Sequence, residues 1–413
     1  MTSRERVRAA VNHQEPDRAP IDLGGMRSSG IMAKAYDNLT KYLGLADSET
    51  FVYDLVQNLA QPEQPILDRF DIDVIDLGRA FLTRPEERKP FVLTDGTPVT
   101  IPAWLETMLE PDGAGRWLIR GDDGQVIAVS PPHQDFFTQA YWPLADGVTD
   151  EKLADLPYHM SQGMWAKVAC APHHRPMTNE WLVEVARVAK KLCEQTDYAI
   201  MVAFGGNLNE HAQFLRNIDE FLMDLAADPR SAHKLLDRLT EIHLESLARF
   251  LGAVGPYVDI IQMGDDLGMQ TGPQFSPKMY REFFLPRHKE IYRAVKKYSD
   301  AFVFLHSCGG IYELIPMLIE AGVDILNPVQ TSARNMEPQR LKREFGRDLC
   351  FWGGGCETQS TLAYGTPEEI GEEVKRRLEI LGPGGGYVFN QVHNILSDVP
   401  PENVVAMLDA AHQ

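Results

Sequence analysis

The stretch "AFVFLHSCGG" (residues 301–310) joins an apolar run to a histidine, a cysteine and two glycines. Alternate side chains of a β-strand point to the same face of a sheet. Phe302, Phe304, His306 and Cys308 therefore share one face, with two groups that can bind a metal at the carboxyl end. Taken alone, the stretch allows two interpretations. It holds either a buried histidine and a buried thiol, both common in protein cores, or two ligands at the end of a strand.

Seven further segments resemble this stretch, because each is rich in β-branched or aromatic residues and ends near Gly, Asn or Asp. They are residues 19–25, 71–78, 199–206, 258–266, 323–330, 349–356 and 387–394. Most of the sequence between them has the three- and four-residue apolar spacing of amphipathic helices. Eight strand–helix units predict an α/β fold, a (β/α)8 TIM barrel that forms a single domain over residues 1–413. An open doubly wound sheet is disfavoured, because no G-x-G-x-x-G motif opens a helix after the first strand.

Residues 85–160 interrupt this alternation of strands and helices. The turn signals "DGT", "DGAG" and "DDGQ" separate short segments typical of β-strands. We therefore expect an antiparallel β insertion after the second strand, contained within the barrel domain.

Composition and charge exclude several functions. The net charge of −19 over 413 residues argues against nucleic acid as a partner, because such a surface needs a basic patch. No apolar stretch approaches the ~20 residues of a membrane span, and the first 20 residues lack the apolar region of a secretory signal. The five cysteines, an odd number, indicate a reduced, cytoplasmic setting in which metal binding or catalysis is likelier than disulfides.

The active site of a TIM barrel lies at the carboxyl ends of its strands. At these ends the sequence places Arg27, Asp76, Asp265, Asp266, His306, Cys308, Asn327, Cys356, Gln391 and His393. One nitrogen and two sulfurs from His306, Cys308 and Cys356 suit tetrahedral zinc, with a fourth position open for substrate or water. The alternative is that these three are core residues without a metal.

The other polar residues at the strand ends have two interpretations each. His393 and Asp266 are predicted to act in catalysis, although His393 also fits a hydrogen-bonded core histidine. The residues predicted to contact the substrate are Arg27, Asp76, Asp265, Asn327 and Gln391. Asp265 and Asp266 alternatively cap the loop that follows them, and Arg27 alternatively forms a surface ion pair.

Several motifs resemble the uroporphyrinogen decarboxylase superfamily over nearly the whole chain. They include "NHQEPDRAPI", "GDDLGMQTGPQFSPKMYREFFLP", "HSCGGIYELIPMLIEAGVDILNP" and "FNQVHNILSDVPPENVVAM". The resemblance implies a (β/α)8 barrel and one of two chemistries. The decarboxylases of that superfamily carry a paired-arginine "RQAGRY" segment, where this sequence reads "GGMRSSGIMAKAY" and keeps only Arg27.

The second branch of the superfamily consists of cobalamin-dependent methyltransferases, whose zinc is held by an H-x-C motif and a later cysteine. His306, Cys308 and Cys356 match that pattern. The resemblance therefore implies Zn²⁺, a corrinoid carried by a partner protein, and methyl transfer to or from a small methylated substrate or a thiol. A metal-free carboxy-lyase resembling uroporphyrinogen decarboxylase is the alternative. The sequence leaves open the methyl donor, the direction of transfer and the oligomeric state, and it is compatible with a homodimer.

Overall fold

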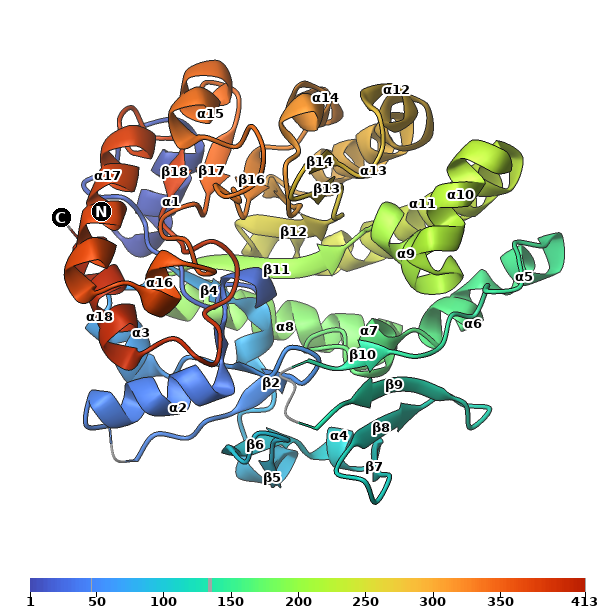
Figure 1. Cartoon of the computed structure of the whole chain (residues 1–413), viewed down its shortest axis with the longest axis horizontal. Coiled ribbons are helices and arrows are strands. Elements are labelled where there is room, and N and C mark those ends of the chain that lie inside the picture. The colour runs from blue at the N-terminus through green and yellow to red at the C-terminus, as the bar shows by residue number, and fades with distance from the viewer. Residues whose placement is uncertain (46, 133–135, 413) are drawn as a thin grey trace.

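The computed structural model describes residues 1–45, 47–132 and 136–412, and its centre is a curved sheet of parallel strands (Figure 1). The strands are β4 (Val74–Asp76), β11 (Ala199–Gly205), β12 (Ile260–Gly264), β15 (Phe302–His306), β16 (Ile325–Asn327), β17 (Cys350–Trp352) and β18 (Tyr387–Val388). Seven of the eight predicted strand segments are thereby confirmed. Across the sheet the order is β4–β11–β12–β15–β16–β17–β18, so each strand neighbours the next one along the chain. A doubly wound sheet would instead reverse its order at a switch point.

The first of the eight predicted strands forms only an isolated bridge, between Ile21 and Phe389. The Phe389 N–H donates to the Pro20 carbonyl at 2.8 Å, and the Asp73 N–H donates to the Ile21 carbonyl at 2.8 Å. This segment therefore bonds to the residues beside both edge strands, β18 and β4. The bridge does not extend into a ladder, because Pro20 has no N–H and Gly24 adopts a left-handed φ of 78°.

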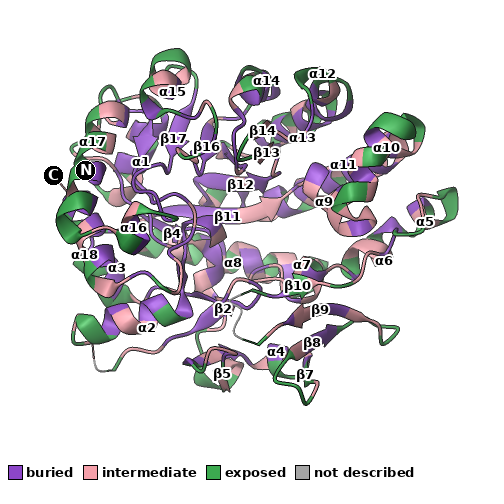
Figure 2. Cartoon of the chain, in the orientation of Figure 1, coloured by how far each residue is buried: buried purple, intermediate pink, exposed green. Residues whose placement is uncertain are grey.

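Most of the central sheet is buried (Figure 2). Two clusters of buried apolar side chains cover its two faces. Those on the concave face come from alternate strand positions and from helix α1 (Ser3–Val11), and they include Val7, Val11, Val74, Met201, Ile260, Phe304, Ile325, Trp352 and Val388. α1 lies at the amino ends of the strands, because its Ala10 carbonyl accepts the N–H of Gly386, just before β18. The opposite, carboxyl ends are left for the site. This two-shell core is consistent with a TIM-barrel-like α/β fold.

Helices cover the convex face of the sheet (Figure 1). They are α8 (Asn179–Gln195), α11 (Pro229–Val254), α13 (Leu285–Tyr298), α14 (Ile315–Ala321), α15 (Pro338–Phe345), α17 (Pro367–Leu381) and α18 (Pro401–Ala410). α17 begins with a capping box, in which the Thr366 side chain accepts the Glu369 N–H. In the described part of the chain, no helix is both long and apolar enough to cross a membrane.

Antiparallel strands follow β4 and precede α8. β5 (Arg88–Val92) pairs with β6 (Pro98–Pro102), and a second sheet has the order β10–β9–β8–β7. Its strands are β7 (Leu109–Pro111), β8 (Trp117–Arg120), β9 (Val126–Ser130) and β10 (Thr138–Gln139). A short helix, α4 (Ala103–Glu106), follows β6 and brings Trp104 toward the carboxyl ends of the central strands.

Candidate metal centre and active site

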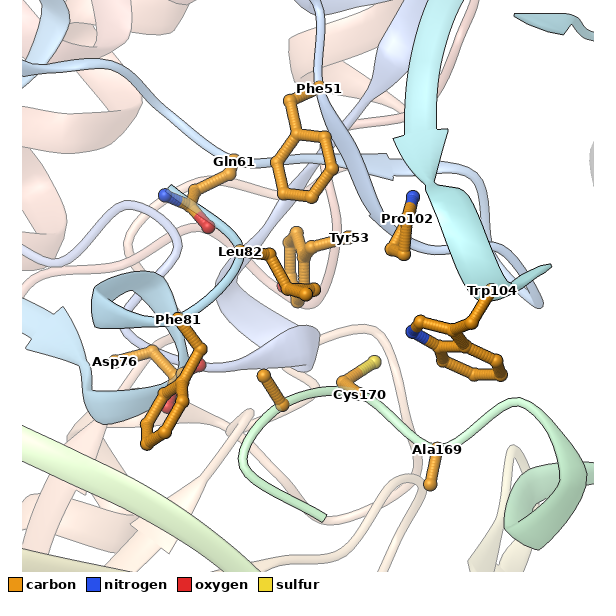
Figure 3. A pocket seen from close by; sticks show the side chains of 12 residues that line it. Phe51, Tyr53, Gln61, Asp76, Phe81, Leu82, Pro102, Trp104, Ala169 and Cys170 are labelled. Atoms are coloured by element: carbon orange, nitrogen blue, oxygen red, sulfur yellow. The ribbon is translucent and has the colours of Figure 1, made fainter. Parts of the chain in front are cut away.

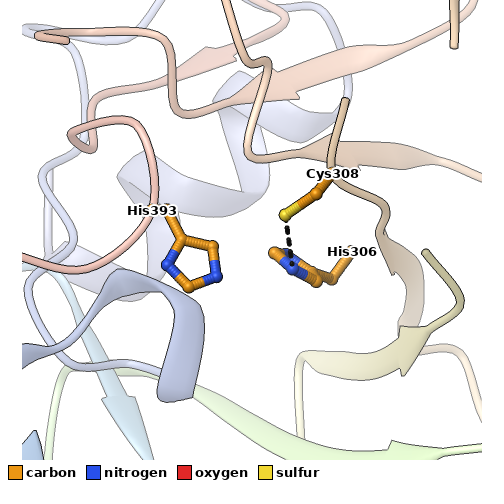
Figure 4. Close-up of side chains that lie close together, drawn as sticks. All are labelled: His306, Cys308 and His393. Carbon is orange, nitrogen blue, oxygen red and sulfur yellow. Dashed lines mark hydrogen bonds between the residues drawn. The ribbon is translucent and has the colours of Figure 1, made fainter. Parts of the chain in front are cut away.

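Three side chains that can bind a metal meet at the carboxyl ends of the central strands. They are His306, Cys308 and His393, whose ligand atoms all lie within 4.8 Å of one another (Figure 4). The donors of tetrahedral zinc, at about 2.0–2.3 Å from the ion, lie roughly 3.3–3.8 Å apart. Small movements of the side chains would therefore bring the three donors onto one ion, and two imidazoles and one thiolate are ligands that zinc prefers.

The backbone around Cys308 explains why two glycines follow it. His306 is the last residue of β15, and the Cys308 N–H donates to the Asp266 Oδ1 at 2.8 Å. Gly309 adopts a φ of 88°, and a Cβ on it would lie 2.5 Å from the carbonyl carbon of Gly268. A side chain there would push away the β13–β14 hairpin (Gly268–Met269 and Gly272–Pro273), which packs directly on this turn.

A hydrogen-bond relay fixes the orientation of the His306 ring. The Asn327 Nδ2 donates to the Trp352 carbonyl at 2.8 Å, which turns the Asn327 Oδ1 toward the His306 Nδ1 at 2.6 Å. The Nδ1 is thereby assigned the proton, and the lone pair of Nε2 faces the Cys308 Sγ at 3.4 Å. Asn327, predicted from the sequence to contact substrate, is fully buried here and orients the histidine.

The electrostatics of this group favour a bound cation. Burial, followed by the nearby Asp266 and Glu210, raises the pKa of the Cys308 thiol well above its usual value. Burial and then His306 lower the pKa of His393 to about 4, so its imidazole is neutral, the form that binds metals. The Asp266 Oδ1 lies 3.7 Å from the His306 Nε2, and its side chain is 34% exposed. A divalent cation would offset this carboxylate and stabilise the Cys308 thiolate.

Cys356, predicted as the third metal ligand, is outside the group of three. Its Sγ lies 3.9 Å from the Glu373 Oε2 on α17, and Glu373 also pairs with Arg377 at 3.0 Å. Cys356 comes shortly after Gly353 and Gly354 in the sequence, and these two glycines adopt φ values of 120° and 67°. His393, expected from the sequence as an acid or base, lies beside His306 and Cys308 instead.

Two other predicted residues are occupied by protein contacts. The fully buried Asp265 accepts the N–H groups of Asn209 and Glu210 at 3.0 and 2.9 Å, where α9 (Asn209–Arg216) begins, and lies 3.0 Å from the His288 Nε2. Gln391, also buried, donates to the Ser29 carbonyl at 3.2 Å. Both side chains therefore hydrogen-bond to the protein backbone and fix its conformation at the strand ends.

Arg27 and Asp76, both predicted to contact substrate, lie close enough for their charges to interact. The Arg27 Nε pairs with the Asp54 Oδ2 at 2.7 Å, its Nη2 donates to the Cys170 Sγ at 3.2 Å, and its guanidinium lies over Trp165 at 4.9 Å. Glu210, which accepts the Asp266 N–H at 3.1 Å, is a further polar residue at the carboxyl ends of the strands that is not among the predicted site residues. Its place five residues after the end of β11 is the signal that could have found it.

The Asp76 carboxyl gives this region a testable dependence on pH. Burial raises its pKa to about 7, so the folded protein binds this proton more tightly than the unfolded chain. The stabilising effect of that proton is lost as the pH rises from about 4 to about 7. We expect the free energy of unfolding of Asp76→Asn, relative to the parent, to increase by on the order of 1–2 kcal/mol between pH 5 and pH 8. Urea unfolding at both pH values measures this difference in the free energy of unfolding. The control is the exposed Asp300→Asn, whose difference from the parent should stay the same. If the difference between Asp76→Asn and the parent is equal at both pH values, the prediction is wrong.

The curved parallel sheet and the histidine–cysteine group at its carboxyl ends define an α/β protein with a candidate metal centre. Residues 169–413 match the family model described as "Uroporphyrinogen decarboxylase (URO-D)". This is more than half of the chain, and the chain belongs to that family.

Curated relatives agree with this assignment, and a solved structure has a similar fold. The sequence is 30% identical over 188 residues to a uroporphyrinogen decarboxylase of Chlorobium phaeobacteroides, covering 44% of this chain and 49% of that protein. It is 28% identical over 191 residues to that of Pseudoalteromonas translucida, covering 45% and 49%. The chain thus spans about half the length of the curated relatives it matches. A methyltransferase from Methanosarcina mazei has a similar fold, with a TM-score of 0.61, 17% identity, and coverage of 100% of this chain and 98% of that one.

Proposed function

We propose that this chain is a zinc-dependent methyltransferase, which moves a methyl group between a small methylated substrate or a thiol and a corrinoid carried by a partner protein. The observation that carries the proposal is the convergence of His306, Cys308 and His393 at the carboxyl ends of the strands. Family membership supports an enzyme, and the fold of the Methanosarcina mazei methyltransferase is compatible with methyl transfer.

The bound zinc would act as a Lewis acid toward the heteroatom of the substrate. His306, Cys308 and His393 would hold it and leave one position open. Asn327 holds the His306 ring so that its Nε2 faces the Cys308 Sγ, through the relay described above. The half-buried Asp266 carboxylate lies 3.7 Å from the His306 Nε2, and we assign it the role of accepting the proton of an incoming thiol or hydroxyl.

A second carboxyl group, that of Glu210, lies next to Asp266 and can hold a proton. Burial, together with Asp266 and Asp265, raises the pKa of Glu210 well above its usual value. Its Oε2 accepts the Asp266 N–H at 3.1 Å and the Asn207 Nδ2 at 2.5 Å. Because two neighbouring carboxylates do not both ionise readily, this environment favours the neutral form of Glu210.

The alternative is a metal-free carboxy-lyase like the curated relatives. Decarboxylation of a polycarboxylate needs cations that are free to bind carboxylates. The one arginine that this sequence keeps at the expected place, Arg27, is already paired with Asp54 and hydrogen-bonded to Cys170. This pairing favours the methyltransferase.

The decisive experiment measures metal content and turnover on the same purified protein. We expect about one zinc per chain and methyl transfer to free cob(I)alamin from at least one member of a panel of methylated amines, methyl ethers and thioethers. Uroporphyrinogen is offered in parallel. A protein that holds no zinc after zinc loading, transfers no methyl group and consumes uroporphyrinogen would replace this function with the carboxy-lyase.

A further inference from the structure

Three polar side chains form a buried network between helix α13 and the end of β12. The Tyr280 Oη lies 3.0 Å from the His288 Nδ1, and the His288 Nε2 lies 3.0 Å from the Asp265 Oδ2. All three residues are fully buried. Burial, followed by the nearby Asp265, raises the pKa of Tyr280 well above its usual value, so its hydroxyl keeps the proton and donates it to Nδ1. The imidazole proton is thereby assigned to Nε2, which donates to Asp265.

A π-helical turn brings Tyr280 and His288 together. The two residues are eight positions apart, and in a regular α-helix their side chains would point about 80° away from each other. The segment Tyr280–Phe284 is instead a π-helix, which adds one residue to its turn before α13 begins at Leu285. The eight positions therefore complete close to two turns, and the two side chains share a face. Turns of this kind are rare and are frequent at functional sites.

Asp265 connects this network to the metal-binding group through both its side chain and its backbone. Its carboxylate accepts the N–H groups of Asn209 and Glu210 in the first turn of α9. The N-cap residue of α9, Leu208, has no side chain that can accept them, so Asp265 supplies the cap from another element. The Asp265 N–H in turn donates to the His306 carbonyl at 3.0 Å.

The next residue, Asp266, is held between α9 and the turn that carries Cys308. The Glu210 Oε2 accepts the Asp266 N–H at 3.1 Å, and the Asn209 Nδ2 donates to the Asp266 carbonyl at 2.7 Å. The Asp266 Oδ1 accepts the Cys308 N–H at 2.8 Å. The place of Asp266 therefore depends on where α9 begins, and Asp265 fixes that start.

We propose that Tyr280 and His288 are positioning residues for the metal-binding group. Acting through Asp265, they fix the start of α9 and the loop after β12, and thereby the turn that carries the metal-binding side chains. Without the His288 donor, the buried Asp265 carboxylate loses one of its three partners, and the loop after β12 relaxes. The inference rests on the proposed function for the role of the metal, but the effect on the backbone needs no metal.

Hydrogen exchange of the metal-free full chain tests the effect on the backbone. His288→Leu removes the donor to Asp265, and we expect amide exchange at residues 264–267 and 306–310 to become about tenfold faster. His288→Gln keeps an amide N–H that can reach Asp265. Its exchange at these residues should therefore return to within about threefold of that of the parent.

The matched control for His288→Leu lies at the other end of the same strand. Asp259 directly precedes β12, is buried, accepts the Ile200 N–H at 2.8 Å and pairs with the Arg8 Nη2 at 2.6 Å. Arg8→Leu removes this partner of a buried aspartate at the amino ends of the strands. It should speed exchange at residues 199–202 and leave residues 306–310 as in the parent, because a general loss of stability would not discriminate between the two ends.

A second pair of variants tests the far end of the network. Tyr280→Phe removes only the hydroxyl that donates to His288, and exchange at residues 306–310 should become about 2- to 5-fold faster. Tyr53 lines the small pocket of Figure 3, and its buried hydroxyl has no hydrogen-bond partner among the residues that the structure describes. Tyr53→Phe makes the same chemical change and should leave that exchange unaltered.

Zinc affinity tests the effect on the metal-binding group. His288→Leu should raise the Kd for zinc, measured by competition with a chromophoric chelator, about tenfold, the lower end of the loss expected for residues that support metal ligands. It should also shift the visible absorption bands of the Co²⁺-loaded protein, because the geometry of the ligands changes. Arg8→Leu should leave the zinc Kd and the Co²⁺ bands as in the parent.

The outcomes separate this inference from the proposed function. Parent-like exchange at residues 306–310 in folded His288→Leu, equal acceleration there in Arg8→Leu, or a zinc Kd that His288→Leu leaves unchanged would overturn it. If His288→Leu does not fold, Tyr280→Phe decides, and parent-like exchange in that variant overturns the inference. A parent that binds no zinc contradicts the proposed function by itself, and exchange in the metal-free protein then still shows whether His288 positions the turn.

Discussion

Under the proposed function, we expect replacement of Cys308 by serine to abolish both zinc binding and methyl transfer. The hydroxyl of serine is a weak zinc ligand at neutral pH, whereas the thiolate is among the strongest. Residues that only support metal ligands cost about 10- to 100-fold in metal affinity or activity when they are changed. Loss of a direct ligand should therefore exceed about 100-fold in both. The measurements are zinc content after dialysis against a chelator and the rate of methyl transfer to cob(I)alamin.

The control for this variant is Cys193→Ser. Cys193 is a free, half-buried thiol on α8, an outer helix, and the same chemical change there should leave zinc content and rate as in the parent. Circular dichroism shows whether both variants fold. A folded Cys308→Ser protein with full zinc content and normal methyl transfer would contradict the proposed function, because no other thiol belongs to the group of three in the described part of the chain.

The sequence predicts the central strands well because buried parallel strands are continuous apolar runs. Such runs end abruptly at Gly, Asn or Asp, as Ala199–Gly205 and Ile325–Asn327 show. The first strand is the exception, since its register depends on two neighbours distant in the chain. At Ile21 those neighbours are the residues beside β18 and β4, and the local sequence, with Pro20 unable to donate, supports only one bridge.

The site is predictable only where the backbone fixes the direction of a side chain. His306 and Cys308 converge because they lie two residues apart at the end of a strand. Cys356 and His393 lie beyond their strands, Cys356 after glycines with positive φ and His393 with a φ of 66°, so alternation no longer fixes where they point. The contact of Cys356 with Glu373 depends on the packing of α17, which no local pattern reveals.

The pairing of buried polar groups is hidden from the sequence for the same reason. Asp265 and Asp266 are adjacent acids, yet one caps α9 from full burial and the other faces the metal-binding group. In Asn327 and Gln391 the amides are bonded to a carbonyl within the protein. These partners come from residues 25 or more positions away, so position on a strand end predicts the neighbourhood of each side chain but not its partner.

The structure and the sequence motif differ in the residue that they indicate as the third metal ligand. In the structure the third candidate donor is His393, and the Cys356 thiol faces Glu373. We therefore expect His393→Ala to lose zinc by more than the ~100-fold that a supporting residue would cost. Cys356→Ser should keep its zinc, because the serine hydroxyl can replace the thiol as the donor to Glu373.

Cobalt substitution reads the ligands directly, independent of turnover. A Co²⁺-loaded parent with one thiolate should show a near-ultraviolet sulfur-to-metal charge-transfer band that Cys308→Ser abolishes and Cys356→Ser leaves unchanged. The opposite result is that Cys356→Ser halves the band and releases zinc, whereas His393→Ala retains its zinc. That result would mean that the Cys356 thiol moves away from Glu373 and binds the ion. In that case the three glycines before Cys356 make the backbone flexible enough for this movement. Glu373, paired with Arg377, would then contact the Cys356 thiol only in the metal-free protein. His393 would then not bind the metal and could act as the acid or base predicted from the sequence.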